Sequence, residues 1–206
     1  MTIGETNLNR RISAANNRPN LQYRPLYFSL NPRNTAKILQ LINLVVQGHW
    51  EEPDLTGLLT KHADARRLSE VALLNNKVVG VALAYADEFA IRGKPVKCIF
   101  LRRLCVDEPL QRTGIGARLL RHIAERIGAA ADYGPLYPIA WVTAQTNPKS
   151  IGFYTKAGFT LAETTVAPAG HRDNIYIATP LEIQLEIKAR MGGMVRDLTA
   201  ASAGID

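Results

Sequence analysis

The sequence predicts one mixed α/β domain, on the basis of its length, its composition and the periodicity of its apolar residues. A chain of 206 residues suits a single domain of ordinary size. Its composition, 47% hydrophobic and 21% charged, can form a buried core and argues against disorder of the whole chain. Apolar runs between turn signals predict several antiparallel strands, followed by the order strand–helix–strand–helix–strand.

The first half begins with a strand and two helices. Residues 26–30 have strand composition and are closed by Asn31-Pro32. Asn34 or Thr35 can cap a helix that runs to about Gln47. Its apolar positions share one helical face: Ile38, Leu41, Ile42, Val45 and Val46. We expect a loop over 48–54 and a second helix to about Ala65.

Strands are predicted next. Residues 71–74 and 77–86 flank Asn75-Asn76, a pattern that predicts a hairpin. Residues 97–106 follow, and their apolar side chains indicate a buried strand.

The second half alternates helices and strands. Four-residue spacing of apolar side chains predicts a helix over 113–127, and a strand follows at 139–143. Asn147-Pro148 suits the start of a short helix that ends at Ala157-Gly158. The last two predicted strands are 159–166 and 174–178.

Residues 179–190 are compatible with two structures. Leu181, Ile183, Leu185 and Ile187 alternate as they would in a strand, whereas Thr179-Pro180-Leu181-Glu182 fits a helix capping box. We expect the strand. The domain should then span 23–190, between a mobile, Asn- and Arg-rich extension at 1–22 and a tail at 191–206.

Several classes of protein are excluded by simple features. No apolar run approaches the roughly 18 residues that span a bilayer, and the N-terminus lacks the apolar core of a signal peptide. On one extended strand, Cys98 and Cys105 would lie roughly 23 Å apart on opposite faces, so they cannot form a disulfide. Two Cys also make a poor zinc site. We therefore expect a cytoplasmic protein with no metal.

The positive charge of the chain is concentrated in two places. The net charge is +7, of which residues 1–24 contribute +3 and residues 92–122 contribute +6, the remainder being slightly negative. Such a balance favours an anionic partner. The N-terminal arginines lack interleaved aromatic side chains apart from Tyr23, so we do not expect nucleic-acid binding.

The segment Gln111-Arg112-Thr113-Gly114-Ile115-Gly116 joins the buried strand to the next helix. Unpaired N–H groups at a helix N-terminus attract phosphate, and Gly114 and Gly116 would let a pyrophosphate approach the main chain. Arg112 adds a charged donor. The Walker A pattern is absent, and Leu119 stands where a dinucleotide fingerprint needs its third glycine.

Together with a second segment, this turn resembles the GNAT N-acetyltransferase superfamily. Gln-x-x-Gly-x-Gly resembles its acetyl-CoA-binding motif, and residues 147–159, with Asn147, Phe153-Tyr154 and Gly158-Phe159, resemble its second signature. The resemblance implies a mostly antiparallel twisted sheet of six to seven strands flanked by about four helices. It implies acetyl-CoA as co-substrate and an amine on a small molecule or a protein as acceptor, with no membrane partner, and it is compatible with a homodimer.

The resemblance also implies roles for individual residues. The main chain of the strand end would bind the pantetheine arm, and the residues of the turn would surround the pyrophosphate. The Val106 N–H is the expected oxyanion donor, Tyr154 the expected general acid, and Asn147 a contact of the pantetheine. The implied cofactor-binding set is Leu104, Cys105, Val106, Gln111, Arg112, Thr113, Gly114, Ile115, Gly116, Ala117 and Asn147.

The general base and the acceptor remain open. Arg102 and Arg103 occupy the strand where many relatives carry a Glu, which leaves Asp87, Glu88, His62 or a water chain as the base. The acceptor loops would hold Glu51, Glu52 and Asp54, and His171, Arg172 and Asp173. A protein of this fold that binds coenzyme A without catalysis is the alternative function.

Overall fold

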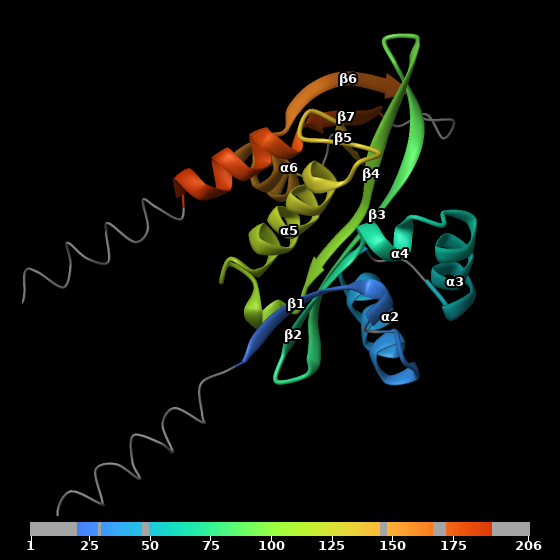
Figure 1. Cartoon of the computed structure of the whole chain (residues 1–206), viewed down its shortest axis with the longest axis vertical. Helices are drawn as coiled ribbons and strands as arrows, with labels where there is room; N and C mark the ends of the chain where they lie inside the picture. Colours follow the sequence, from blue (N-terminus) through green and yellow to red (C-terminus); the bar gives the residue numbers. More distant parts are fainter. Residues whose placement is uncertain (1–19, 29, 47–49, 145–147, 167–171, 191–206) are drawn as a thin grey trace, which may run out of the picture.

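The computed structural model of the chain contains one seven-stranded sheet in the order β1-β2-β3-β4-β5-β7-β6 (Figure 1). The structure describes residues 20–28, 30–46, 50–144, 148–166 and 172–190. All neighbouring strands are antiparallel except β4 and β5, which are parallel. The predicted mixed α/β class and strand number are thereby confirmed. The strands are β1 Leu21–Pro25, β2 Glu70–Leu74, β3 Lys77–Ile91, β4 Lys94–Val106, β5 Ile139–Ala144, β6 Thr160–Val166 and β7 Arg172–Ala178.

Helices cover both faces of the sheet (Figure 1). One face packs against α2 Pro32–Val46, α3 Glu52–Lys61 and the short α4 Ala65–Leu68. The other packs against α5 Ile115–Ala129, α6 Pro148–Lys156 and a helix over 180–190. We call these the α2 face and the α5 face. Their apolar residues form two separate buried clusters, because successive residues of a strand point to opposite faces.

The start of the domain differs from the prediction. The first strand is β1, which begins at Leu21, inside the segment expected to be an extension, and residues 26–28 form a 3₁₀ turn instead of a strand. Leu26 N–H donates to the Ser69 carbonyl at 2.9 Å, and its side chain is buried. Tyr27 and Phe28 are exposed, so their apolar character did not indicate a buried strand.

The second predicted helix is two helices. A capping box between Glu51 and Asp54 begins α3 at Glu52, and α3 ends at Lys61 before α4. The predicted loop over 48–54 is therefore shorter than expected, and residues 47–49 lie outside the described part of the chain.

Residues 180–190 form a helix, so the expected strand is wrong. Thr179 and Glu182 complete the capping box: the Glu182 carboxylate accepts the Thr179 N–H at 2.7 Å, and the Glu182 N–H donates to Thr179 Oγ1 at 3.2 Å. Ile183 and Ile187 are buried, while Leu181 and Leu185 are exposed. The alternation in the sequence therefore has two sources. Ile183 and Ile187, four residues apart, lie on the buried face of the helix, and Leu181 and Leu185 are apolar residues on its exposed surface.

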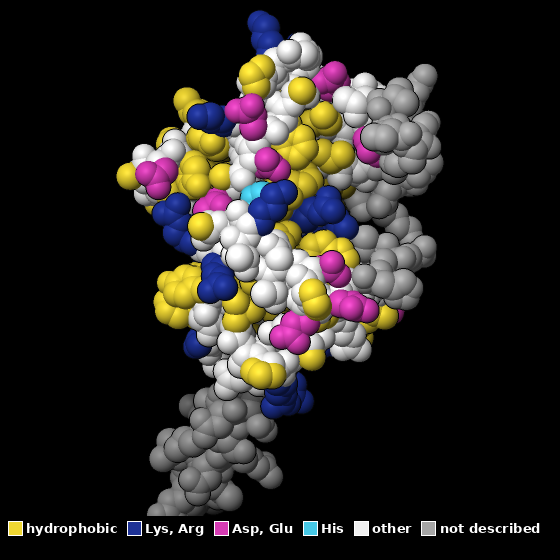
Figure 2. Space-filling model, turned by 90° about the vertical axis from the view of Figure 1, so that its right-hand side faces the viewer, with side chains coloured by type: hydrophobic (Ala, Val, Ile, Leu, Met, Phe, Trp, Pro, Cys, Tyr) yellow, Lys and Arg dark blue, Asp and Glu magenta, His cyan; other side chains and the backbone are white. Residues whose placement is uncertain are grey.

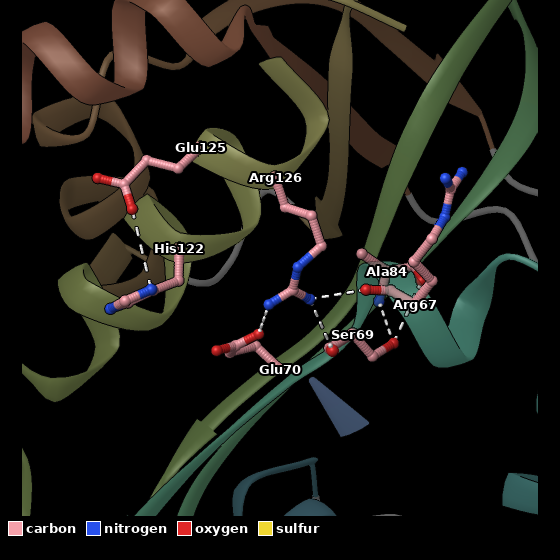
Figure 3. A network of polar contacts seen from close by, with 7 residues as sticks. All are labelled: Arg67, Ser69, Glu70, Ala84, His122, Glu125 and Arg126. Atoms are coloured by element: carbon pink, nitrogen blue, oxygen red, sulfur yellow. Dashed lines mark hydrogen bonds and ion pairs between the residues drawn. The ribbon is translucent and has the colours of Figure 1, made fainter. Parts of the chain in front are cut away.

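A polar network fixes α5 to the sheet (Figure 3). The Arg126 guanidinium forms an ion pair with Glu70, which is 1% exposed, and donates to the carbonyls of Arg67 and Ser69. The Ser69 hydroxyl bonds to both main-chain groups of Ala84 at 3.0 and 3.2 Å. Because the helix that starts at the glycine turn is held in this way, the position of the turn depends on contacts some distance from it.

Candidate active site

The strands β4 and β5 separate in the middle of the sheet. They pair only at Ile99↔Ile139 and Phe100↔Ala140, with the Ile99 N–H donating to the Pro138 carbonyl at 2.9 Å. From Leu101 onward, β4 has no partner on the β5 side within the described residues. A gap therefore opens next to the C-terminal part of β4.

A β-bulge decides which main-chain groups face this gap. Leu83 pairs with Arg103 and Ala84 pairs with Leu101, so Arg102 is the extra residue. Before the bulge, an odd-numbered residue, Ile99, directs its N–H toward β5. After the bulge, an odd-numbered residue, Asp107, directs its N–H the other way and donates to the Val79 carbonyl of β3 at 2.9 Å. The bulge thus reverses the alternation of main-chain groups along the strand.

Because of this reversal, the three strand residues that were predicted to bind the pantetheine arm do not all face the gap. Leu104 and Val106 direct their main-chain groups into the gap, where a ligand can bind them. Cys105 pairs with Val81 and directs its groups toward β3. Of the three, Leu104 and Val106 are suited to bind a pantetheine arm through the main chain, whereas Cys105 is not.

The bulge also corrects the expectation for the two cysteines. Cys98 and Cys105 do not lie on opposite faces: Cys98 alternates with Ile99, which belongs to the α5 face, and Cys105 packs in the α2-face cluster. Both are buried free thiols, and burial raises each pKa to about 12. They act as apolar core residues.

The glycine turn provides unpaired N–H groups. After the 3₁₀ turn Glu108–Leu110, the first helical hydrogen bond of α5 runs from the Arg118 N–H to the Gly114 carbonyl at 3.1 Å. The N–H groups of Ile115, Gly116 and Ala117 therefore have no partner within the helix. The Thr113 hydroxyl donates to the Leu110 carbonyl at 2.6 Å, and the Gln111 amide donates to the Val106 carbonyl at 3.2 Å. These bonds hold the turn against the end of β4.

The two glycines of the turn have different functions. Gly114 has φ +86, and a Cβ placed there would meet no heavy atom within 4 Å. Its space is open, as a cradle for a phosphate requires. A Cβ on Gly116 would lie 3.3 Å from Leu104 Cδ2 and 3.6 Å from Phe153 Cζ. Gly116 is therefore needed for close packing of α5 on β4 and α6, a requirement that the sequence did not reveal.

The basic stretch at 92–122 does not surround the turn as a unit. Arg92 and Lys94 lie at the hairpin between β3 and β4, about 40 Å along the strand from Val106. Asp107 is paired with Lys37 of α2 at 3.4 Å. Arg112, at φ +65, is the predicted cation within the turn itself, and it is exposed.

Tyr154 is 5% exposed and packs among aromatic rings. It stacks on Trp141 with ring centroids 3.8 Å apart and meets Phe153 and Phe159 edge-on. Burial raises the pKa of Tyr154, an effect that Cys105 increases and Arg103 decreases. Its Oη therefore keeps its proton over the whole physiological range. Asn147 and His171 lie outside the described residues.

The carboxylates considered as bases are far from the gap. Asp87 pairs with Cys98, about 26 Å along β4 from Val106, and Glu88 lies further along the same hairpin. His62 packs against Tyr85, with ring centroids 3.9 Å apart. Neither carboxylate reaches Val106.

A separate pocket of about 250 Å³, with Asn31, Glu52 and Arg66 in its wall, contains none of the predicted cofactor residues.

Neither a metal cluster nor a membrane helix is found in the part of the chain that the structure describes. No three His, Cys, Asp or Glu side chains there gather in a way that could hold a metal ion. None of the helices described there has the length and apolar character needed to cross a membrane.

Comparison with known proteins gives one family and many similar folds. The model of the acetyltransferase (GNAT) family matches residues 36–159. No curated protein gives a significant match. Similar solved structures include the NatC complex bound to Gag peptide and CoA, with a TM-score of 0.62, 17% identity, and coverage of 77% of this chain and 98% of that one.

Two further structures illustrate the same fold. Arabidopsis thaliana Naa50 in complex with the bisubstrate analogue CoA-Ac-MVNAL has a TM-score of 0.56 and 17% identity, with 77% of this chain and 98% of that chain covered. The ribosomal-protein-S18-alanine N-acetyltransferase from Escherichia coli has a TM-score of 0.55 and 16% identity, with 78% and 94% covered. At these identities the likeness shows the fold.

Proposed function

The chain belongs to the GNAT acetyltransferase family, and we propose that it transfers the acetyl group of acetyl-CoA directly to an amine in a ternary complex. The observation that carries this proposal is the arrangement, along one continuous segment, of N–H groups that have no main-chain partner among the described residues. Leu104 and Val106 face the gap between β4 and β5, and Ile115, Gly116 and Ala117 present N–H groups at the start of α5. An extended ligand with a phosphate at one end fits this arrangement.

Residues Gln111 to Ala117 would hold the pyrophosphate of the coenzyme. Gly114 leaves the necessary space, and Arg112 adds a positive charge. Leu104 and Val106 would bind the pantetheine arm, joined by Asn147 from outside the described residues. Acetyl-CoA supplies the acetyl group as a thioester.

Val106 and Tyr154 are the proposed catalytic groups. The Val106 N–H would donate to the acetyl oxygen as negative charge develops there, and the Leu104 N–H lies about 7 Å further along the same edge. Tyr154 Oη would give its proton to the leaving sulfur. Because Asp87 and Glu88 are distant and the His62 ring packs against Tyr85, we propose that water accepts the proton of the amine.

The structures similar in fold include enzymes named for peptide or protein acceptors. A protein or peptide amine is therefore one acceptor class for this chain, and a small amine is the other. The homodimer and the cytoplasmic location stay predictions.

One observation favours the alternative of a protein that binds coenzyme A without catalysis. Tyr154 is enclosed by Trp141, Phe153 and Phe159, an environment that also suits a side chain serving only to pack the core. A test must therefore separate binding from turnover.

Thermal unfolding with acetyl-CoA tests binding, and coenzyme A release from a panel of amines tests turnover. A ligand at 100 times its Kd stabilises a protein by about 2.7 kcal/mol, which for a chain of this size raises Tm by roughly 5–10 °C. No shift at millimolar acetyl-CoA would refute both functions. A shift without turnover of any amine would favour the non-catalytic alternative.

The variant Tyr154→Phe then tests the proton donor. It keeps the ring stack, so we expect the acetyl-CoA shift to remain and kcat to fall by about 10²-fold. Tyr176→Phe is the matched control, because Tyr176 is also buried against Trp141, with ring centroids 5.3 Å apart. If both variants turn over equally well, Tyr154 is a packing residue.

A further inference from the structure

Two consecutive arginines lie at the bulge, beside the point where β4 and β5 separate. Arg102 is the extra residue of the bulge, and Arg103 follows it. The Arg102 guanidinium carbon lies 5.8 Å from the centroid of the Phe100 ring, and that of Arg103 lies 5.5 Å from the centroid of Trp50. Since Phe100 and Trp50 both belong to the α2-face cluster, both guanidinium groups are on that face.

Part of this face is exposed, and apolar and basic side chains lie together there. Figure 2 shows Lys and Arg side chains next to a His side chain in the middle of the face, between hydrophobic side chains. Arg102 is exposed and Arg103 is half-buried. A ligand that reaches the gap from this face would meet both.

The charge of the two arginines is not balanced by the described residues. Arg67 and Arg126 each pair with a carboxylate, but neither Arg102 nor Arg103 forms an ion pair there. The Arg103 Nε is buried with no hydrogen-bond partner, and its Nη1 donates to the Arg102 carbonyl at 2.9 Å. A buried donor left unpaired is costly, so a site of this kind gains stability from a ligand that accepts its hydrogen bonds.

Among the described residues, the groups that shift the pKa of Arg103 include no carboxylate. Burial lowers the pKa of Arg103, and the charge of Arg102 lowers it further. The groups that act in the opposite direction are Cys105, Tyr85 and Tyr154, none of which is a carboxylate. Two adjacent cations with no carboxylate partner among the described residues favour binding of an anion.

Arg103 is also held in a defined position. The Arg103 guanidinium lies over the ring of Trp50. The main chain of Trp50 forms two hydrogen bonds with the Asn43 side chain: the Trp50 main-chain N–H donates to Asn43 Oδ1 at 2.7 Å, and the Trp50 carbonyl accepts from Asn43 Nδ2 at 2.8 Å. A planar guanidinium that is already positioned binds a carboxylate through two parallel hydrogen bonds at low entropic cost.

The arginines are placed to contact the acceptor and not the phosphates of the coenzyme. Leu104, whose main chain faces the gap, is the residue directly after Arg103, whereas Gly114 lies beyond the end of β4. Arg102 and Arg103 therefore lie nearer along the chain to the acetyl end of the proposed site than to the turn that would hold the phosphates.

We propose that the acceptor amine belongs to a molecule that also carries a carboxylate close to the amine, and that Arg103 and Arg102 bind this carboxylate. The acceptor is then an amino acid, or a peptide with an acidic residue at one of its first two positions. This inference rests on the proposed acetyltransferase function.

Matched acceptor pairs that differ only in carboxylate or carboxamide test the inference by coenzyme A release. The pairs are alanine and alaninamide, Asp-Ala-amide and Asn-Ala-amide, and Ala-Asp-amide and Ala-Asn-amide. We expect kcat/KM to favour the carboxylate at least about tenfold in one pair, which is the effect of a charge-assisted hydrogen bond. Ratios within twofold in all three pairs, or no turnover of any member while other amines react, would overturn it.

The variant Arg103→Gln connects the preference to the site. Within this variant we expect the favoured ratio to fall to within twofold, whereas it should persist in Arg190→Gln, an exposed arginine on the helix over 180–190. An undiminished ratio in Arg103→Gln would refute the inference. The acetyl-CoA shift in Tm should remain, and its loss would show that Arg103 serves the coenzyme or the fold instead.

A binding measurement separates this inference from the proposed function. With coenzyme A saturating, at least one of the three carboxylate acceptors should raise Tm further than its carboxamide partner in the wild type, and not in Arg103→Gln. If no amine is turned over, the proposed function fails, and this shift alone decides the inference: its presence supports an anion site and its absence refutes it.

Discussion

The substitution Gly114→Ala tests the phosphate cradle most directly, because the cost of the new methyl group to the protein and to the ligand can be separated. Gly114 has φ +86, a conformation that costs a non-glycine residue about 1–2 kcal/mol. Since a Cβ there meets no protein atom within 4 Å, no clash adds to this strain. For a chain of this size the expected fall in Tm is about 2–8 °C.

The effect on the ligand should be separate and larger. The methyl group projects into the open space beside the N–H groups at the start of α5, where a pyrophosphate would bind. Loss of one charge-assisted hydrogen bond costs about 1.5–3 kcal/mol, which raises Kd about 10- to 150-fold. Calorimetric titration with acetyl-CoA measures this change, and thermal unfolding without ligand measures the strain.

Gly93→Ala is the matched control. Gly93 has φ +70 in the hairpin between β3 and β4, and a Cβ there also meets nothing within 4 Å. It should lose a similar amount of stability and keep its affinity for acetyl-CoA. If Gly114→Ala binds acetyl-CoA within twofold of the wild type, or if Gly93→Ala is weakened equally, the turn does not bind the pyrophosphate as reasoned.

Two further predictions concern buried ionisable groups. Arg126→Met leaves Glu70 charged and unpaired, so the free energy of unfolding should fall by about 3–5 kcal/mol at pH 8. Burial already raises the pKa of Glu70, and loss of Arg126 raises it further. The folded state then binds the proton more tightly than the unfolded chain, so the loss of unfolding free energy should be smaller near pH 5 than at pH 8. Denaturant titrations should also show a smaller loss in the double variant with Glu70→Gln, which removes the unpaired charge. The pKa of about 12 for Cys98 and Cys105 leaves only about one thiol in 10⁴ ionised at pH 8, so a chromogenic disulfide reagent should react far more slowly with the folded protein than with the unfolded one. Equal rates in both states would show that the thiols are accessible and their pKa values normal.

Local signals in the sequence were sufficient for much of the fold. The spacing of Ile115, Leu119, Ile123 and Ile127 predicted α5, and all four are buried. Gly158 was expected in a left-handed conformation and has φ +97. Such features depend on a few neighbouring residues, which is why they can be read before any tertiary contact is known.

The sequence-based prediction of secondary structure was wrong where the apolar pattern fitted both a strand and a helix, and where apolar side chains are exposed. Residues 180–190 alternate in hydrophobicity, yet the capping box between Thr179 and Glu182 and the burial of Ile183 and Ile187 make them helical. Local pattern cannot tell which apolar side chains will be covered, and here only Ile183 and Ile187 of this segment join the buried cluster of the α5 face.

The sequence by itself determined the order of most elements, the glycine turn and the membership of an acetyltransferase family, because these depend on local backbone requirements and short motifs. Only the tertiary structure decided which groups act together. The extra residue at Arg102 is defined by pairing with β3, and it turns Leu104 and Val106, instead of Cys105, toward the gap. The approach of Arg103 to Trp50, more than fifty residues away in the chain, likewise depends on packing α2 and Trp50 onto the sheet. Contacts between residues distant in sequence have no periodic signature, so the chemistry of the acceptor side became visible only once the chain was folded.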